Sequence, residues 1–314
     1  MLDQILSVTF WVSVLSSAIN LATPILSAGL GEIITQKSGI MNLGLEGTML
    51  MGALGAFAGC YFSGSLLVGV LCGILVGFIM GAMMGFLSIT MRGNQVIAGT
   101  ALSMLGGGLA TFLYRSIFGV SKLPPTVKNF PILEIPFLTK IPVVGDILFR
   151  HNLMVYIIFL LVPVTWFLME KTMLGLKIKA VGEHPKAVES KGLSVYGLRY
   201  TSVILGGGYA GLAGAFLTLG YVNVFTDSMV SGRGYIALAV VIFARWKPLN
   251  AMWGALLFGF LNGLQTRLQA VGAPIPNQFL AMMPYVITIV VLIIVSRNAE
   301  FPAAYTVPYS KRDK

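Results

Sequence analysis

The stretch from Met41 to Met91, MNLGLEGTMLMGALGAFAGCYFSGSLLVGVLCGILVGFIMGAMMGFLSITM, carries one charged side chain, that of Glu46. As helix, these residues would extend about 75 Å at ~1.5 Å per residue, enough to cross a ~30 Å hydrocarbon core twice. A membrane β-barrel strand would alternate apolar and polar residues over about ten positions, and the stretch has no such segment. The stretch therefore predicts membrane-spanning helices.

The composition of the whole chain agrees with this prediction. Of 314 residues, 56% are hydrophobic and only 10% are charged, and two are cysteine. Soluble domains carry roughly 25% charged residues, which cover the outside of a packed core. The composition excludes a soluble domain, a disordered chain and a disulfide-stapled scaffold. We expect an all-α polytopic membrane protein that forms a single transmembrane domain over residues 1–314.

Nine apolar runs are candidates for membrane spans: 8–30, 42–62, 66–90, 96–118, 152–169, 200–221, 234–244, 251–268 and 279–295. The seventh has only eleven residues. We therefore expect it to be a half-helix, or a tilted span that its neighbours extend. The first run contains Asn20 and Pro24 and could form two segments. These runs predict eight to ten transmembrane helices.

Lysine and arginine predict the orientation, because cytoplasmic loops of membrane proteins are enriched in both. If the loop at about 170–199 is cytoplasmic, that side holds 14 of the 21 basic residues, including those of the tail 297–314. Residues 119–150 then form a long external segment. The same count places the N-terminus outside, unless the first run crosses twice.

Small residues recur every four positions in three places: Gly69, Gly73, Gly77, Gly81 and Gly85; Gly207 and Gly211; and Gly259 and Gly263. A four-residue spacing places side chains on one face of a helix. In lipid, such faces let helix backbones approach closely. We predict a tight helix-packing seam at each of the three.

The dipeptide Asn-Gln opens two apolar runs, at Asn94-Gln95 and at Asn277-Gln278. Five of the predicted spans separate the two openings, so the pairs begin helices from opposite faces of the membrane. An inverted-topology repeat has this property, and such repeats are common in transporters with a site near the midplane. Chance recurrence of a dipeptide is the alternative.

Several enzyme motifs are missing. There is no Gly-Lys dipeptide and hence no P-loop, and neither His-Glu-x-x-His nor Gly-x-Ser-x-Gly occurs. Cys60 and Cys72 lie within apolar runs and are interpreted as small core residues. We therefore predict no catalytic residue, no metal site and no cofactor bound by this chain.

Polar residues within the apolar runs are the candidates for a substrate pathway, because ionisable groups in the bilayer are unfavourable and usually functional. Glu46 is the leading one, and it lies in a glycine-rich stretch that weakens regular helix. The alternative is structural, with Glu46 capping a helix start and the amides making interhelical hydrogen bonds. The predicted pathway residues are Asn42, Glu46, Asn94, Gln95, Asn223 and Asn262.

The loop from Lys171 to Arg199 contains six basic and two acidic residues between two spans. A short helix is predicted there, with Pro185 in its first turn and a stop at Gly192. The loop is either a solvated connection or a docking surface for a cytoplasmic partner.

Three motifs resemble permease subunits of bacterial ABC importers for nucleosides and simple sugars, in the larger group that also serves branched-chain amino acids. SGIMNLGLEG (38–47) resembles the signature Gly-x-Ile/Val-Asn-Ile/Leu-Gly-Leu-Glu-Gly. GEHPKA (182–187) followed by KGL (191–193) resembles the family's cytoplasmic loop, with His184 in place of the commoner asparagine. GRGYIALA (232–239) followed by RWKP (245–248) resembles the late signature.

The ending FPAA (301–304) with PY (308–309) is similar to that of nucleoside permeases in particular. The resemblance implies an ABC importer permease fold in the bacterial cytoplasmic membrane. It also implies three partners: a cytoplasmic ATPase that binds the ATP, a second, unlike permease, and an extracytoplasmic substrate-binding protein. The implied ATPase-coupling residues are Gly182, Glu183, His184, Pro185, Ala187, Lys191, Gly192 and Leu193.

Other functions stay open at this point. A simple sugar such as ribose is an alternative substrate. An ion-coupled secondary transporter with Glu46 as its coupling carboxylate, a passive channel and a membrane-embedded enzyme are alternative classes.

Overall fold

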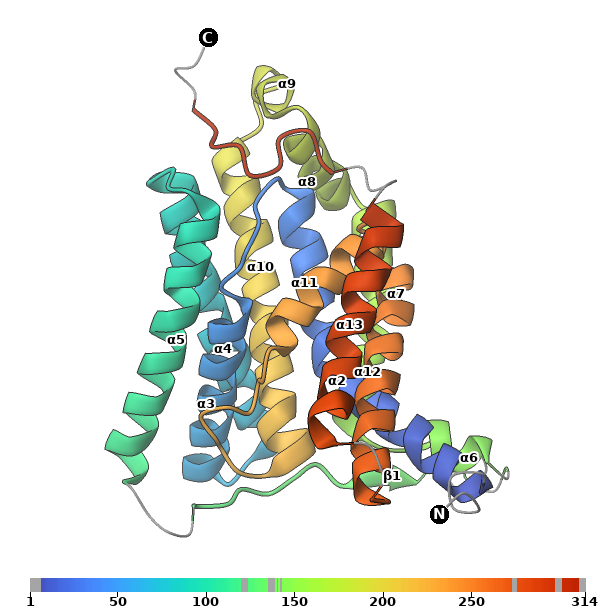
Figure 1. The fold of residues 1–314 in the computed structure, drawn as a ribbon. Helices are drawn as coiled ribbons and strands as arrows, with labels where there is room; N and C mark the ends of the chain where they lie inside the picture. Colours follow the sequence, from blue (N-terminus) through green and yellow to red (C-terminus); the bar gives the residue numbers. More distant parts are fainter. Residues whose placement is uncertain are drawn as a thin grey trace.

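The computed structural model describes residues 7–119, 124–134, 139, 141, 143–272, 276–296 and 301–310, and they form a helical bundle (Figure 1). Six of the basic residues that were counted for the orientation lie outside the described residues, at 122, 140, 297, 311, 312 and 314. The long elements are α2 (Val8–Lys37), α3 (Leu45–Ser63), α4 (Leu66–Gly85), α5 (Gln95–Phe118), α7 (Leu153–Lys171), α10 (Val195–Ala215), α12 (Pro248–Ala270) and α13 (Asn277–Ser296). The short helices are α6 (Val144–Leu148), α8 (Met173–Glu183), α9 (Pro185–Ser190) and α11 (Arg233–Phe243), and π-helical turns η1 (Phe86–Thr90) and η2 (Phe216–Val222) extend α4 and α10.

Each predicted apolar run corresponds to a helix of the described chain. By length and composition, six helices can cross a membrane: 8–37, 45–63, 66–90, 95–118, 153–171 and 195–222. The helices α11, α12 and α13 account for the last three runs. Where eight to ten transmembrane helices were predicted, the described residues thus show six candidate spans and three further helices at the remaining apolar runs.

The first run forms one helix, so its division into two segments was wrong. Pro24 lies inside α2. Proline removes one backbone hydrogen bond, but neighbouring side chains can supply others within a membrane. One turn away, the Thr23 hydroxyl donates to the carbonyl of Ile19 at 2.7 Å, and Ser27 Oγ donates to the carbonyl of Tyr209 in α10 at 2.8 Å.

Two helices begin in the interior of the bundle (Figure 1). Residues 38–44 turn back from the end of α2 and lead into α3, and residues 223–232 turn back from the opposite end of the bundle and lead into α11. We call 38–44 the re-entrant segment. Irregular backbone at membrane depth is tolerated only where protein surrounds it or where it lines a cavity. The eleven-residue run is thus a half-helix.

The helices α2–α5 and α10–α13 repeat the same order, in opposite directions. Each set has a long helix, a segment that turns back, a helix that begins inside the bundle, and two further helices. Figure 1 shows α5 starting on the same side as α9, and α13 starting on the opposite side. The two Asn-Gln pairs open these two helices, so the prediction that they start from opposite faces is confirmed.

The glycine faces form the predicted seams. A Cβ atom built on Gly77 of α4 would lie 2.9 Å from the Cα of Gly211 in α10. Helices α12 and α2 form the equivalent pair in the inverted arrangement, and a Cβ on Gly259 of α12 would lie 2.8 Å from the backbone nitrogen of Ala22 in α2. Only glycine permits such backbone contact.

Replacing Gly77 by valine is expected to lower the free energy of unfolding by about 1–3 kcal/mol or more, because three added carbons cannot fit between α4 and α10. Thermal unfolding of the detergent-solubilised chain measures this effect. Gly108→Val is the matched control, because a Cβ there meets no atom within 4 Å. Equal melting temperatures for the two variants would contradict the packing described here.

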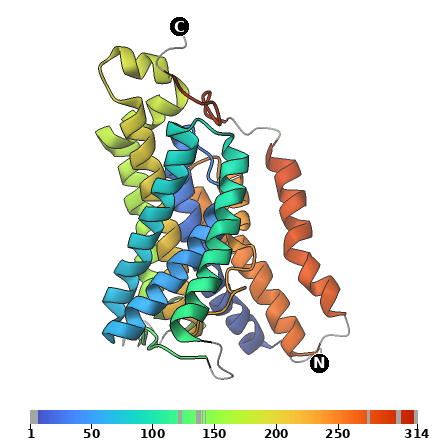
Figure 2. The ribbon, with the colours of Figure 1, turned by 90° about the vertical axis from the view of Figure 1, so that its left-hand side faces the viewer.

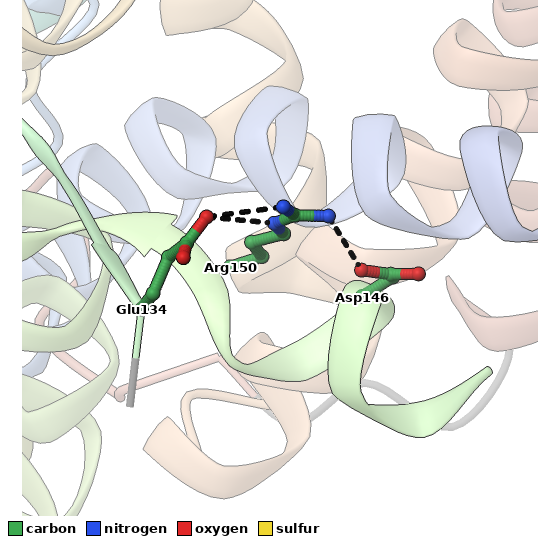
Figure 3. Close-up of polar contacts among 3 residues, drawn as sticks. All are labelled: Glu134, Asp146 and Arg150. Carbon is green, nitrogen blue, oxygen red and sulfur yellow. Dashed lines mark hydrogen bonds and ion pairs between the residues drawn. The ribbon is translucent and has the colours of Figure 1, made fainter. Parts of the chain in front are cut away.

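The described residues of the segment 119–150 lie at the end of the bundle opposite α8 and α9 (Figure 1). Strand β1 (Ile132–Glu134) pairs antiparallel with β2 (Arg150–Asn152). Arg150 contacts Glu134 and Asp146 at 3.0 Å each (Figure 3). These carboxylates raise the pKa of Arg150, but the pairs are exposed, so they contribute little to stability.

His151 of β2 attaches this segment to helix α2. Its Nε2 lies 2.7 Å from the carbonyl of Ile147 and therefore donates, so Nδ1 accepts from Asn20 Nδ2 at 3.2 Å. Burial lowers the pKa of His151, which favours this neutral form. Asn20, which interrupts the first apolar run, thus serves a tertiary contact.

Candidate functional site

Glu46 joins the two helices that begin inside the bundle. It lies in the first turn of α3, and its carboxylate accepts hydrogen bonds from the backbone N–H of Gly232 at 2.7 Å and of Gly234 at 2.9 Å. Both donors belong to the start of α11, where backbone N–H groups lack helical partners and the helix dipole favours negative charge. Glu46 thus caps the start of α11, which is the geometry that the structural alternative describes.

The glycines around Glu46 make this contact possible. Gly232 has φ +78°, in the left-handed region. A Cβ on Gly234 would lie 2.8 Å from Glu46 Oε2, and one on Gly47 would lie 2.7 Å from the Cα of Ser103 in α5. The motifs 38–47 and 232–239 are thus two halves of one junction between α3 and α11.

A second carboxylate, Glu32, lies fully buried in α2 beside the re-entrant segment. Its Oε1 accepts from the backbone N–H of Asn42 at 2.9 Å and from Gln36 Nε2 at 3.0 Å. Gln36 Oε1 in turn accepts from the indole N–H of Trp246 at 2.7 Å. This polar cluster fixes the path of the chain just before α3.

Three buried side-chain atoms of this region have no hydrogen-bond partner among the described residues: Glu32 Oε2, Asn42 Nδ2 and Gln95 Nε2. Gln95 also holds the re-entrant segment, since its Oε1 accepts from the backbone N–H of Met41 at 2.8 Å. An unpartnered buried polar atom is unfavourable by about 1–3 kcal/mol, so such atoms favour a state in which they gain partners.

The structure brings together only part of the predicted pathway. Asn42 and Gln95 hold the re-entrant segment, and Glu46 lies at the start of the helix that follows it. Asn94 is an exposed N-cap of α5. Asn223 ends η2 with φ +62°, and Asn262 Nδ2 donates to the carbonyl of Phe258 in its own helix at 3.0 Å.

The sequence analysis missed Glu32 and Gln36. Its first apolar run ended at residue 30, whereas α2 continues to Lys37. The available signal was the spacing of Glu32 and Gln36, because polar residues four apart lie on one helix face.

Replacing Glu32 by alanine is expected to lower the free energy of unfolding by about 2–4 kcal/mol, because the buried Asn42 N–H loses its acceptor and a cavity forms. Glu32→Gln is the matched control, since its amide oxygen can still accept that bond. Thermal unfolding compares the two variants, and equal losses of stability would contradict this role of Oε1.

The loop 171–199 forms two helices at the end of the bundle that also holds the C-terminal residues (Figure 1). The predicted short helix is present as α9, with Pro185 in its first turn and Gly192 at φ +76° after its end. Glu183, His184 and Ala187 are exposed, whereas Gly182 is buried. A Cβ on Gly182 would lie 3.3 Å from the backbone nitrogen of Gly39, so α8 ends against the re-entrant segment.

Among the remaining predicted coupling residues, Lys191 and Gly192 are exposed, and Pro185 and Leu193 are half-buried. Val188 anchors α9 from beneath, in a cluster with Val181 and Val195. The outer surface of α9 is thus free for contact with another protein.

The fold, with two inverted sets of helices and a helical loop projecting from one end, is that of an ABC transporter permease. A solved ABC transporter in an inward-facing conformation matches with a TM-score of 0.52 at 18% identity, over 93% of this chain and 88% of that one. The family model for the branched-chain amino acid transport system/permease component matches residues 14–296. The chain belongs to this permease family and is a multi-pass protein of the cell membrane.

The chain is similar to named permeases over nearly its whole length. TsgC13, which is named as a glucose ABC transporter permease protein of Haloferax volcanii, is 39% identical over 90% of this chain and 92% of its own. The guanosine permease NupQ of Bacillus subtilis and the nucleoside permease NupC of Lactococcus lactis are 34% and 31% identical, each over 92% of this chain and 94% of their own.

Each of these organisms also has a second matching permease. These are the glucose permease TsgB13 at 24% identity, the guanosine permease NupP at 24% and the nucleoside permease NupB at 25%. This chain covers 68–79% of their lengths, against 92–94% for the first three. The similarity therefore distinguishes two kinds of permease.

Proposed function

We propose that this chain is a non-catalytic permease subunit of an ABC importer that carries nucleosides across the cytoplasmic membrane. The observation that carries the proposal is the similarity to NupQ and NupC over more than nine-tenths of all three chains. The tail motifs at 301–304 and 308–309 support the same substrate class. ATP hydrolysis takes place on a separate ATPase, which docks at the exposed surface of α9.

A second, unlike permease completes the membrane part of the importer. The support for it is the pairing of relatives, since NupQ and NupP, NupC and NupB, and TsgC13 and TsgB13 each come from one organism. This chain is the counterpart of NupQ, NupC and TsgC13. An extracytoplasmic binding protein delivers the ligand to the external face.

The substrate passes the junction of α3 and α11. Glu46 and Asn42 lie at or just before the start of α3, and Gln95, the first residue of α5, contacts the re-entrant segment there. Helix N-termini and irregular backbone at such a place present polar groups inside the bundle. Asn94, Asn223 and Asn262 act at the two ends of this route. Closure of the ATPase moves α9 and thereby rearranges the junction.

A simple sugar is the second candidate substrate, and the similarity to the Haloferax permeases favours it. Uptake of radiolabelled nucleosides and of glucose by liposomes containing the complete importer separates the two. We expect uptake of the nucleoside, with competition by unlabelled nucleosides and none by glucose or ribose. Uptake of glucose with no uptake of nucleosides would reverse the assignment.

A further inference from the structure

The C-terminal residues 301–310, which we call the strap, cross the end of the bundle on the side of α8 and α9 (Figures 1 and 2). Two backbone hydrogen bonds hold the strap between segments that are far apart in sequence. The N–H of Ala304 donates to the carbonyl of Gly182 at the end of α8 at 2.8 Å, and that of Thr306 donates to the carbonyl of Gly39 at 2.9 Å. The strap thus bridges the helical loop and the re-entrant segment.

On one side, the strap contacts both helices of the ATPase-coupling loop. The N–H of Ala303 donates to the carboxylate of Glu183 at 3.2 Å, and the Tyr309 hydroxyl donates to that of Glu189 in α9. The Tyr309 ring packs in the cluster of Val181 and Val188. Burial and Glu189 raise the pKa of Tyr309 to about 12, so its hydroxyl remains a donor at neutral pH.

On the other side, the strap contacts the bundle. Arg199 of α10 is 1% exposed, and its Nη1 donates to the carbonyl of Val307 at 3.1 Å. The ring of Phe301 meets that of Trp246 edge-on, with their centroids 4.9 Å apart. Trp246 is the residue that donates to Gln36, and Gln36 contacts Glu32.

These contacts form an unbroken path from the coupling helix to the segment that leads into α3. The path runs from Glu189 through Tyr309 and the strap to Gly39, and by a second branch through Trp246 to Glu32 and Asn42. Packed chains of hydrogen bonds and rings can carry a displacement, provided that the joined elements move together. Helix α9 also packs through Val188 on Val181 of α8 and Val195 of α10, and the strap adds a connection from α9 to the re-entrant segment.

We propose that the strap is a positioning element of transport, which makes the re-entrant segment follow the displacements of α9. Tyr309 is its positioning residue on α9, and the Ala304 and Thr306 N–H groups are its attachments to α8 and to Gly39. This inference rests on the proposed ATP-driven import. It assigns to the tail a role in converting ATP hydrolysis into transport, separate from the docking of the ATPase itself.

Two variants cut the strap at different points. Tyr309→Phe removes the bond to Glu189 and keeps the packed ring, and Ala304→Pro removes the N–H that donates to Gly182. Tyr305→Phe is the matched control within the strap, because it also removes one hydroxyl but leaves the hydrogen bonds of Ala304, Thr306 and Tyr309 in place. None of the three changes the outer surface of α9.

The test measures ATP hydrolysis and nucleoside uptake in the same liposomes, with the complete importer reconstituted and ATPase copurification checked first. We expect both strap variants to retain the ATPase and to hydrolyse ATP, while nucleosides carried per ATP fall about five-fold or more, the effect of losing one hydrogen bond. Tyr305→Phe should keep the wild-type ratio.

The inference would be overturned if both strap variants carried as many nucleosides per ATP as the wild type. It would also be overturned if the variants lost the ATPase, so that uptake and hydrolysis fell in equal proportion. The wild-type importer separates this failure from failure of the proposed function. If wild-type liposomes show no ATP-dependent nucleoside uptake, the proposed function itself is wrong.

Discussion

Glu46→Gln is expected to reduce nucleoside uptake by about ten-fold to one hundred-fold. The carboxylate accepts from Gly232 and Gly234 with separate oxygens, and glutamine replaces one of them with an NH2 group that faces an N–H donor. The charge at the start of α11 is lost as well. Together these effects amount to about 1.4–3 kcal/mol at the junction of α3 and α11.

Uptake by the reconstituted importer measures this effect, after gel filtration has shown that the variant still assembles. Glu134→Gln is the matched control, because Glu134 is an exposed carboxylate of strand β1, at the end of the bundle opposite α9. Full transport by Glu46→Gln would show that its charge is dispensable and that the junction does not shape the pathway.

Ala187→Arg is expected to abolish copurification of the ATPase. Ala187 is an exposed residue of α9, and arginine there would add bulk and positive charge to the docking surface proposed on this helix. Truncating or blocking a central interface residue weakens binding by about 2–4 kcal/mol, roughly thirty-fold to a thousand-fold. Glu183→Lys should weaken docking too, but it also removes the strap contact of Glu183.

Ile132→Arg is the control for added bulk and charge, because Ile132 is exposed on strand β1, at the end of the bundle opposite α9. Its complex should retain the ATPase. Unchanged copurification by Ala187→Arg would place the docking surface elsewhere, and loss by Ile132→Arg would indicate general disruption of the permease.

Much of the fold was predictable because lipid imposes simple rules on sequence. The length of the apolar runs predicted the helices, and the four-residue spacing of glycines predicted the seams between α4 and α10 and between α2 and α12. Pro185 and Gly192 predicted where α9 begins and ends. Each of these signals is local, lying within one helix or one loop. The eleven-residue run predicted either a half-helix or a tilted span that its neighbours extend, and the structure shows the eleven-residue helix α11.

The contacts that build the site were not predictable, because they join residues far apart in the chain. Glu46 accepts a hydrogen bond from the backbone N–H of Gly232, and neither sequence motif indicates that it contacts the other. Glu32 was missed because α2 continues beyond the apolar run, into a region where polar residues are buried by the re-entrant segment and not by lipid. The strap resembled a family ending, but its contacts with Gly39 and Gly182 required the structure.

The source of energy distinguishes the importer from an ion-coupled transporter or a channel. Glu46 could serve as a coupling carboxylate in an ion-driven protein, but both of its oxygens accept backbone N–H bonds, which hold it in a capping role. The family and the relatives instead belong to ABC transporters. Energy supply is therefore the property to measure.

The most direct measurement is nucleoside uptake by liposomes that contain this chain, its ATPase, the second permease and the binding protein, with and without ATP. We predict that uptake requires ATP and the ATPase, and that it continues when the proton gradient is collapsed. Uptake without ATP, or uptake abolished by collapse of the gradient alone, would contradict the account.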